Sequence, residues 1–135
     1  KLIYHPRSYG EAYEALLRQA KGHRIHYQTT QGAQTAFFIP PRHGDARTAP
    51  LWLCFSGNGS LALDWLRVNE KWDSRHAYLL IDYPSYGDCA GKPTPKNIRE
   101  SSTPSGRAHR PFHQHDRHGA RGTRLATMLP EHAPL

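Results

Sequence analysis

The strongest constraint on the fold of this chain is a pair of short apolar runs separated by a stretch with helical periodicity. Residues 51–55 read LWLCF and are apolar at every position, which is typical of a strand buried on both faces of a sheet. Residues 77–83 read AYLLIDY and have the same buried character, and residues 61–68 have the spacing of an amphipathic helix. Two such strands joined by a helix form a βαβ unit with parallel strands and a right-handed crossover. A helix-covered parallel sheet is therefore predicted.

The region before this unit adds a helix and an antiparallel hairpin. In residues 9–21 apolar side chains recur at spacings of three and four, and Gly22 follows at a position typical of a helix C-terminus. Residues 24–30 and 33–39 have the pattern of two strands, and the short connection through Gly32 favours a hairpin. The sequence thus predicts an α/β fold in which an antiparallel hairpin leads into a parallel sheet.

The composition of the chain changes sharply at Ser101. From there to Leu135 there are five of the ten histidines, five arginines and four prolines, but no lysine, tyrosine or tryptophan. The apolar residues of this segment follow neither a strand nor a helix period, so they cannot bury enough surface to offset the entropy of ordering. We therefore predict a partial domain over residues 1–101 and a disordered tail over residues 102–135, in which only residues 123–129 suit a short helical turn.

The net charge of +7 would suit a nucleic-acid-binding protein, but the distribution of the charges does not. The 18 lysines and arginines are scattered, without a basic stripe, so no specific nucleic-acid partner is predicted. Cys54 and Cys89 make no disulfide framework, and we expect Cys54 in the core and Cys89 in a loop. There is no apolar run of membrane-spanning length, so an anchor is expected only upstream of Lys1. The compartment, cytoplasm or bacterial cell envelope, and the oligomeric state stay open.

Two polar, glycine-containing segments directly follow the two predicted parallel strands. Residues 56–60 read SGNGS, and glycines in such a loop let successive backbone N–H groups converge on an anion. Residues 82–94 read DYPSYGDCAGKPT and follow the second strand. Parallel sheets place their functional loops just beyond the carboxyl ends of their strands. These two segments are therefore the candidate functional loops.

Together, the two segments resemble those of the α/β-hydrolase superfamily, specifically its single-domain serine hydrolases. In that family the third strand ends in an H-G-N-G-like loop, and the fourth ends in D-Y-P-G-Y-G-x-S-x-G-x-P. This chain has Ser56 in place of the histidine, Ser85 in place of a glycine and Cys89 in place of a serine. The LIYHP of residues 2–6 is also similar to an L-x-Y-H-P segment of the same group. The resemblance extends over about residues 2–100 and implies the strand order 1-2-4-3-5.

The resemblance implies a role for several residues of the two loops. Asn58 would supply a backbone N–H to the oxyanion hole, which stabilises the tetrahedral intermediate of acyl transfer. The substrate would be a small acyl compound, and neither a cofactor nor a metal ion is implied. Gly57 and Gly59 would give the loop its geometry, and Ser56 and Ser60 would line the substrate. Asp82 and Gly87 would be structural residues, with Asp82 holding the turn that follows it.

The nucleophile that this family requires is not found in the sequence. A G-x-S-x-G elbow should follow a fifth strand near residues 120–130, where the chain instead reads ARGTRL. We expect these 135 residues to lack esterase, lipase or peptidase activity, although a complete relative would hydrolyse an ester, thioester or amide. Our hypothesis is that the tail is a premature or out-of-frame ending of a longer hydrolase. Without a fifth strand, residues 51–55 would form an exposed apolar edge, which favours aggregation.

Other interpretations of the same residues stay open. In one alternative the chain is a non-catalytic binding module, in which the loop at residues 57–59 holds an anion or the basic tail contacts nucleic acid. In another it is a remnant without function. Residues 87–92 approach a phosphate-binding P-loop, but the glycine spacing is one residue short and Pro93 replaces the required Ser or Thr. Four histidines of the tail lack the cysteine or carboxylate partners of a zinc site: His109, His113, His115 and His118.

Overall fold

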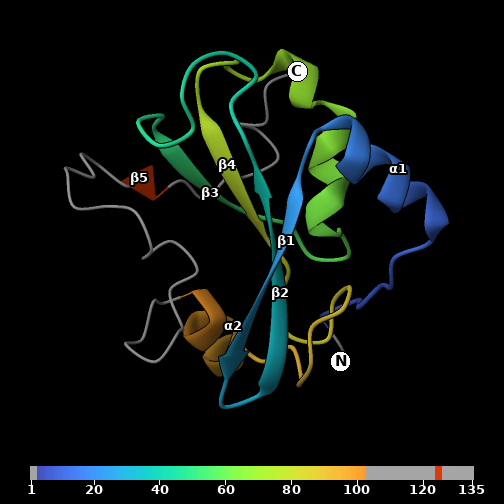
Figure 1. Cartoon of the computed structure of the whole chain (residues 1–135). Coiled ribbons are helices and arrows are strands. Elements are labelled where there is room, and N and C mark those ends of the chain that lie inside the picture. The colour runs from blue at the N-terminus through green and yellow to red at the C-terminus, as the bar shows by residue number, and fades with distance from the viewer. Residues whose placement is uncertain (1–2, 103–123, 126–135) are drawn as a thin grey trace.

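The computed structural model describes residues 3–102 and 124–125 of the chain. From α1 to β4 its main helices and strands follow one another as the sequence predicts, and the α/β class is confirmed (Figure 1). In chain order the elements are α1 (Glu11–Gln19), β1 (His23–Thr29), β2 (Gly32–Ile39), β3 (Leu51–Phe55), the 3-10 helices η1 (Ala62–Arg67) and η2 (Asn69–Lys71), β4 (Ala77–Ile81), α2 (Pro95–Ser102) and the short β5 (Arg124–Leu125).

The strands form one mixed sheet in the order β1-β2-β4-β3-β5. β1 and β2 are antiparallel, with Thr29 opposite Gly32 at the turn of the predicted hairpin. β2 is also antiparallel to β4, whereas β3 and β4 are parallel, with Phe55 opposite Ile81 at their ends. The carboxyl ends of β3 and β4 therefore lie side by side, and both candidate loops begin at this edge of the sheet.

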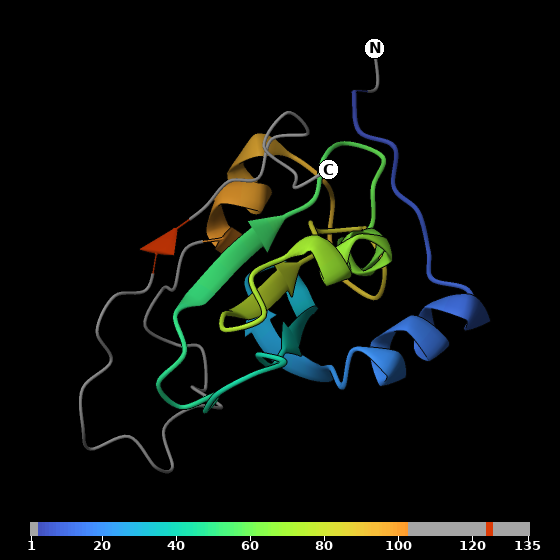
Figure 2. The same ribbon diagram turned by 90° about the horizontal axis from the view of Figure 1, so that it is seen from above.

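The apolar side chains of β3 and β4 divide between the two faces of the sheet. α1 and η1 cover one face, and α2 lies on the other (Figure 2). Because strand residues alternate in direction, Cys54 and Leu80 belong to the larger cluster, which includes residues of α1 and η1. Their neighbours Phe55 and Ile81 belong to a smaller cluster. Burial on both faces explains why these strands are continuously apolar in the sequence.

Helix α1 is shorter than the predicted residues 9–21 at both ends. Tyr9 stays outside the helix because its side chain reaches across to bond Asp82. At the other end, Lys21 adopts a left-handed φ of 54°, and the Gly22 N–H donates to the Leu17 carbonyl at 2.9 Å. The left-handed residue that ends the helix is thus Lys21 and not the glycine that the sequence suggests.

The helix predicted over residues 61–68 is wrong in type, because η1 is a 3-10 helix of six residues. One local and one tertiary hydrogen bond hold the beginning of η1: the Leu61 N–H donates to Oδ2 of Asp64 in the first turn at 2.9 Å, and the Ala62 N–H donates to Asp82 Oδ1 at 2.8 Å. Short connecting stretches such as this one are a common setting of 3-10 geometry. β4 accordingly ends at Ile81, since Asp82 leaves the sheet to bond η1.

Most of the predicted disordered tail lies outside the described residues, including the four histidines considered for zinc. Helix α2 continues to Ser102, and Arg124–Leu125 pairs in parallel with Trp52 and Leu53 of β3. The prediction of a helical turn is therefore wrong at residues 124–125. The prediction of an unpaired edge is wrong at Trp52 and Leu53 of β3. The physical reason is that backbone N–H and C=O groups at a sheet edge gain hydrogen bonds from any extended segment beside them.

Candidate functional site

The two candidate loops meet at the carboxyl ends of β3 and β4. The link between them is Tyr86, a fully buried residue of the loop after β4. Its hydroxyl donates to Asn58 Oδ1 at 2.9 Å and accepts from the Gly59 N–H at 3.4 Å. The fold thus brings the predicted oxyanion loop into direct contact with the second motif.

Asn58 lies at the exposed tip of its loop, and its side chain has a structural function that the sequence analysis missed. Its Oδ1 also accepts from the His5 N–H at 3.1 Å, and its Nδ2 donates to the Ile3 carbonyl. Within the described residues no acceptor is assigned to the backbone N–H of Asn58. This N–H, the group implicated by the family resemblance, is therefore available to a ligand.

The two glycines beside Asn58 have different geometries. The Ser60 N–H donates to the Gly57 carbonyl at 3.1 Å, which closes a four-residue turn. Gly59, the third residue of this turn, has a φ of 82°, the left-handed value that a type II turn requires there. Gly57 lies outside the left-handed region, and a Cβ at this position would meet nothing within 4 Å. Loop geometry therefore requires glycine at position 59 and not at position 57.

The two serines of the loop are also placed differently. Ser56 is only 2% exposed, and its Oγ is buried without a hydrogen-bond partner in the part of the chain that the structure describes. Ser60 is half-buried and closes the turn through its N–H. The side chain of Ser56, which the sequence analysis placed against the substrate, is thus covered by protein.

Asp82 is completely buried where β4 ends. Burial raises the pKa of its carboxyl to about 6, although hydrogen bonds from Tyr9 and from the Ala62 N–H act in the opposite direction. Burial, followed by the nearby Asp82 charge, raises the pKa of the Tyr9 phenol, so the shared proton stays on Tyr9. The carboxylate therefore holds η1 and the N-terminal segment. From the sequence we expected it to hold the turn that follows it.

Gly87 occupies a position that has no room for a side chain. Its φ is 55°, and a Cβ would lie 2.7 Å from Asp82 Oδ2 and 2.4 Å from Cε2 of Tyr9. Its N–H donates to the Arg7 carbonyl at 2.8 Å. The close approach of these three segments requires glycine here.

Residues 3–9, which we term the N-terminal strap, run along both loops. Besides the contacts of Tyr9, the Arg7 guanidinium donates to the Gly59 carbonyl at 3.4 Å and to Asp64 Oδ2 at 3.2 Å. Asp64 also accepts from the Tyr13 hydroxyl at 2.7 Å. No sequence pattern pointed to Arg7 or Tyr13. Their partners Gly59 and Asp64 lie more than 50 positions further along the chain.

Neither cysteine is suited to act as a nucleophile. Both thiols are buried, and burial raises the pKa of Cys54 and the pKa of Cys89 to about 12. The thiolate is the nucleophilic form of cysteine. The Cys89 Sγ instead accepts a hydrogen bond from the Thr35 N–H at 3.3 Å, which ties the second loop to β2.

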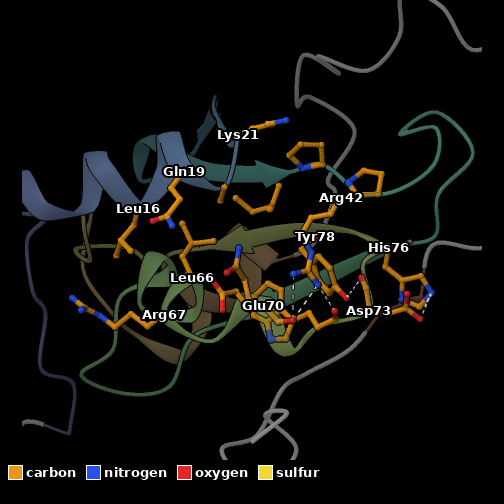
Figure 3. Close-up of a pocket in the computed structure, with 16 residues that line it drawn as sticks. Leu16, Gln19, Lys21, Arg42, Leu66, Arg67, Glu70, Asp73, His76 and Tyr78 are labelled. Carbon is orange, nitrogen blue, oxygen red and sulfur yellow. Dashed lines mark hydrogen bonds and ion pairs between the residues drawn. The ribbon is translucent and has the colours of Figure 1, made fainter.

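A pocket of about 520 Å³ lies at the opposite ends of the strands from the two loops (Figure 3). Two of its polar side chains, those of Arg42 and His76, are engaged in holding the fold. Arg42 donates to the carbonyls of Glu70 and Trp72, and His76 Nδ1 accepts from Trp52 Nε1 at 2.8 Å. None of the residues that line the pocket belongs to the candidate loops, and no pattern in the sequence predicted it.

Two further properties concern the described residues alone. Residues 3–102 and 124–125 contain no group of three or more His, Cys, Asp or Glu side chains placed to hold a metal ion. In the same residues, no helix has the length and apolar character needed to cross a membrane.

Comparisons with known proteins add little to this geometry. No protein-family model matches the chain, and no curated protein sequence matches it. A solved structure described as AbyA5 wildtype aligns with 59% of this chain at 15% identity and a TM-score of 0.45. The match spans 23% of the length of that protein. A similarity of this size supports no conclusion about fold or function.

Proposed function

We propose that this chain is the N-terminal part of an α/β-hydrolase scaffold, with residues 56–60 as its oxyanion-binding loop. The observation that carries the proposal is the junction of the two loops, where the Tyr86 hydroxyl bonds Asn58 Oδ1 at 2.9 Å. It places an available backbone N–H on the loop after β3, beside the turn after the adjacent parallel strand. Ends of adjacent parallel strands are a common location of ligand sites.

Two other features support the proposal. The observed order β1-β2-β4-β3-β5 is the order that the family resemblance implies. Ser85, which stands where the family has glycine, adopts a left-handed φ of 74°. This conformation is disfavoured for residues with a side chain, so the backbone at position 85 has the geometry that a glycine would supply.

The chemistry of the proposed site is stabilisation of negative charge. In hydrolysis of an ester, thioester or amide, attack on the carbonyl makes its oxygen an anion, and backbone N–H groups of the loop would donate to that oxygen. The sequence has no G-x-S-x-G, so we propose that these residues bind an oxyanion without carrying out the attack.

Titration of the ¹⁵N-labelled chain with inorganic phosphate tests the proposal. We expect the amide resonances of Gly57 and Asn58 to shift in a saturable way, whereas sodium chloride at matched ionic strength leaves them in place. Hydrolysis of 4-nitrophenyl esters should proceed at the buffer rate, and a fluorophosphonate probe should not label the chain. Absence of a specific shift at the loop, or ester hydrolysis by the pure chain, would contradict the proposal.

A further inference from the structure

The N-terminal strap makes polar contacts with both of the last two residues of the loop Gly57–Asn58–Gly59. The Ile3 carbonyl accepts a hydrogen bond from Asn58 Nδ2, and the His5 N–H donates one to Asn58 Oδ1. The Arg7 guanidinium donates to the Gly59 carbonyl at 3.4 Å. Because these bonds use side-chain and carbonyl groups, they leave the Asn58 N–H available while restricting the loop around it.

The Tyr86 hydroxyl joins the strap, the loop and the turn after β4 at one atom. It donates to Asn58 Oδ1 at 2.9 Å, and it accepts from the N–H groups of His5 at 3.0 Å and Gly59 at 3.4 Å. One donor and two acceptor positions are the full capacity of a hydroxyl. Since the ring of Tyr86 is completely buried, this saturated hydroxyl is a fixed reference point for the loop.

We propose that the Asn58 side chain and Tyr86 are positioning residues through which the docked N-terminal strap sets the anion-binding geometry of the loop. This inference rests on the proposed function and adds a means of regulating it. Binding of an anion at the loop and docking of the strap are then linked, so each strengthens the other by the same factor. Displacement of the strap, by a partner or by proteolysis, lowers anion affinity without altering any group that touches the anion.

Three variants of the full chain test the link, with inorganic phosphate as the probe. Asn58→Ala keeps the backbone N–H, and it leaves no cavity because the side chain is exposed. Tyr86→Phe keeps the buried ring and removes only the hydroxyl. Tyr83→Phe is the matched control, because Tyr83 lies in the same turn and its hydroxyl has no hydrogen bond in the described part of the chain.

We expect Asn58→Ala and Tyr86→Phe each to raise the phosphate Kd about fivefold, the usual effect of one net hydrogen bond on an equilibrium. Amide hydrogen exchange of Gly59 and Ser60, whose N–H groups donate to the Tyr86 hydroxyl and the Gly57 carbonyl, should accelerate by a similar factor, and Tyr83→Phe should change neither quantity. In the wild-type chain, phosphate should also slow tryptic cleavage after Arg7, since the linkage is reciprocal.

The two readouts separate the inference from the proposed function. Phosphate binding that is equal in all four chains overturns the inference and leaves the proposed function intact. If the wild-type chain does not bind phosphate, the proposed function fails. Hydrogen exchange then decides whether the Asn58 side chain and Tyr86 hold the loop in place. Unchanged exchange in Asn58→Ala and Tyr86→Phe then overturns the role of Asn58 and Tyr86 as positioning residues of the loop, whereas faster exchange supports it. Thermal melts identify any variant that fails to fold, and the remaining positioning variant then decides the outcome.

Discussion

The Tyr9 phenol donates a hydrogen bond to the buried carboxylate of Asp82, 73 residues further along the chain. The Leu63 N–H in turn donates to the Tyr9 oxygen at 3.3 Å, and the Ala62 N–H donates to the same carboxylate. The pair therefore joins the strap, the first turn of η1 and the end of β4. Because the loop of residues 56–60 connects β3 to η1, this junction fixes one end of the loop, while Tyr86 fixes its tip.

The pH dependence of the free energy of unfolding should show the titration of the Asp82 carboxyl. Its pKa is raised to about 6 by burial, whereas an unfolded aspartate titrates near 4. The folded state therefore binds more protons between these values, and the free energy of unfolding falls as the pH rises through that window. Two pKa units correspond to roughly 3 kcal/mol. Asp82→Asn should remove this decline while keeping an acceptor for the Ala62 N–H, as urea unfolding at pH 4 to 7 would measure.

The exposed Asp88 in the same loop provides the control for this measurement. Asp88→Asn should keep most of the decline between pH 4 and 6, because burial raises the pKa of Asp82 more than the nearby Asp88 charge does. An Asp82→Asn variant with the same slope as the wild type would show that the buried carboxyl is not the titrating group.

Removal of the Tyr9 hydroxyl should destabilise the fold. Tyr9→Phe leaves the Asp82 carboxylate and the Leu63 N–H each short of one partner, and a hydrogen bond to a charged group contributes about 1.5–3 kcal/mol. We expect a loss of about 2 kcal/mol in the free energy of unfolding. Tyr27→Phe is the matched comparison, because the Tyr27 hydroxyl is buried with no partner in residues 3–102 and 124–125. That variant should be neutral or slightly more stable, and equal losses in the two would refute the argument.

Local patterns were enough to predict β1 to β4 but not the two-residue β5, and the continuous apolar runs of β3 and β4 correctly reported burial on both faces. β3 occupies the predicted residues 51–55, and the hairpin of β1 and β2 follows its predicted course within one residue. The type of η1 was not predictable from its periodicity, because two of the groups that hold its first turn, those of Asp82 and Tyr9, come from outside the helix. The same holds for the site: Asn58 and the glycines follow from a motif, but Tyr86 matters through contacts that only the fold creates.

The three glycines of the two loops should respond differently to alanine. Gly57→Ala should change stability by less than about 0.5 kcal/mol, because its Cβ enters open space. Gly59→Ala should cost about 1–2 kcal/mol for the left-handed φ of 82° alone. Gly87→Ala adds contacts of 2.4 and 2.7 Å to the same strain and should cost at least about 3 kcal/mol. Urea unfolding of the three variants checks this order, and a Gly57→Ala loss equal to that of Gly59→Ala would contradict it.

Ser85→Gly should stabilise the chain, which is unusual for removal of a side chain. Ser85 is held at a φ of 74° while its N–H donates to the Cys89 carbonyl at 3.1 Å. A left-handed conformation costs a residue with a Cβ roughly 1–2 kcal/mol, and glycine avoids that cost but gains freedom in the unfolded chain. The net gain should be about 0.5–1 kcal/mol in the free energy of unfolding. Ser60→Gly, at a position without a positive φ, should instead be neutral or destabilising. A gain at position 85 and none at position 60 would show that the second loop adopts the glycine geometry of the hydrolase motif, whereas equal effects would remove that support.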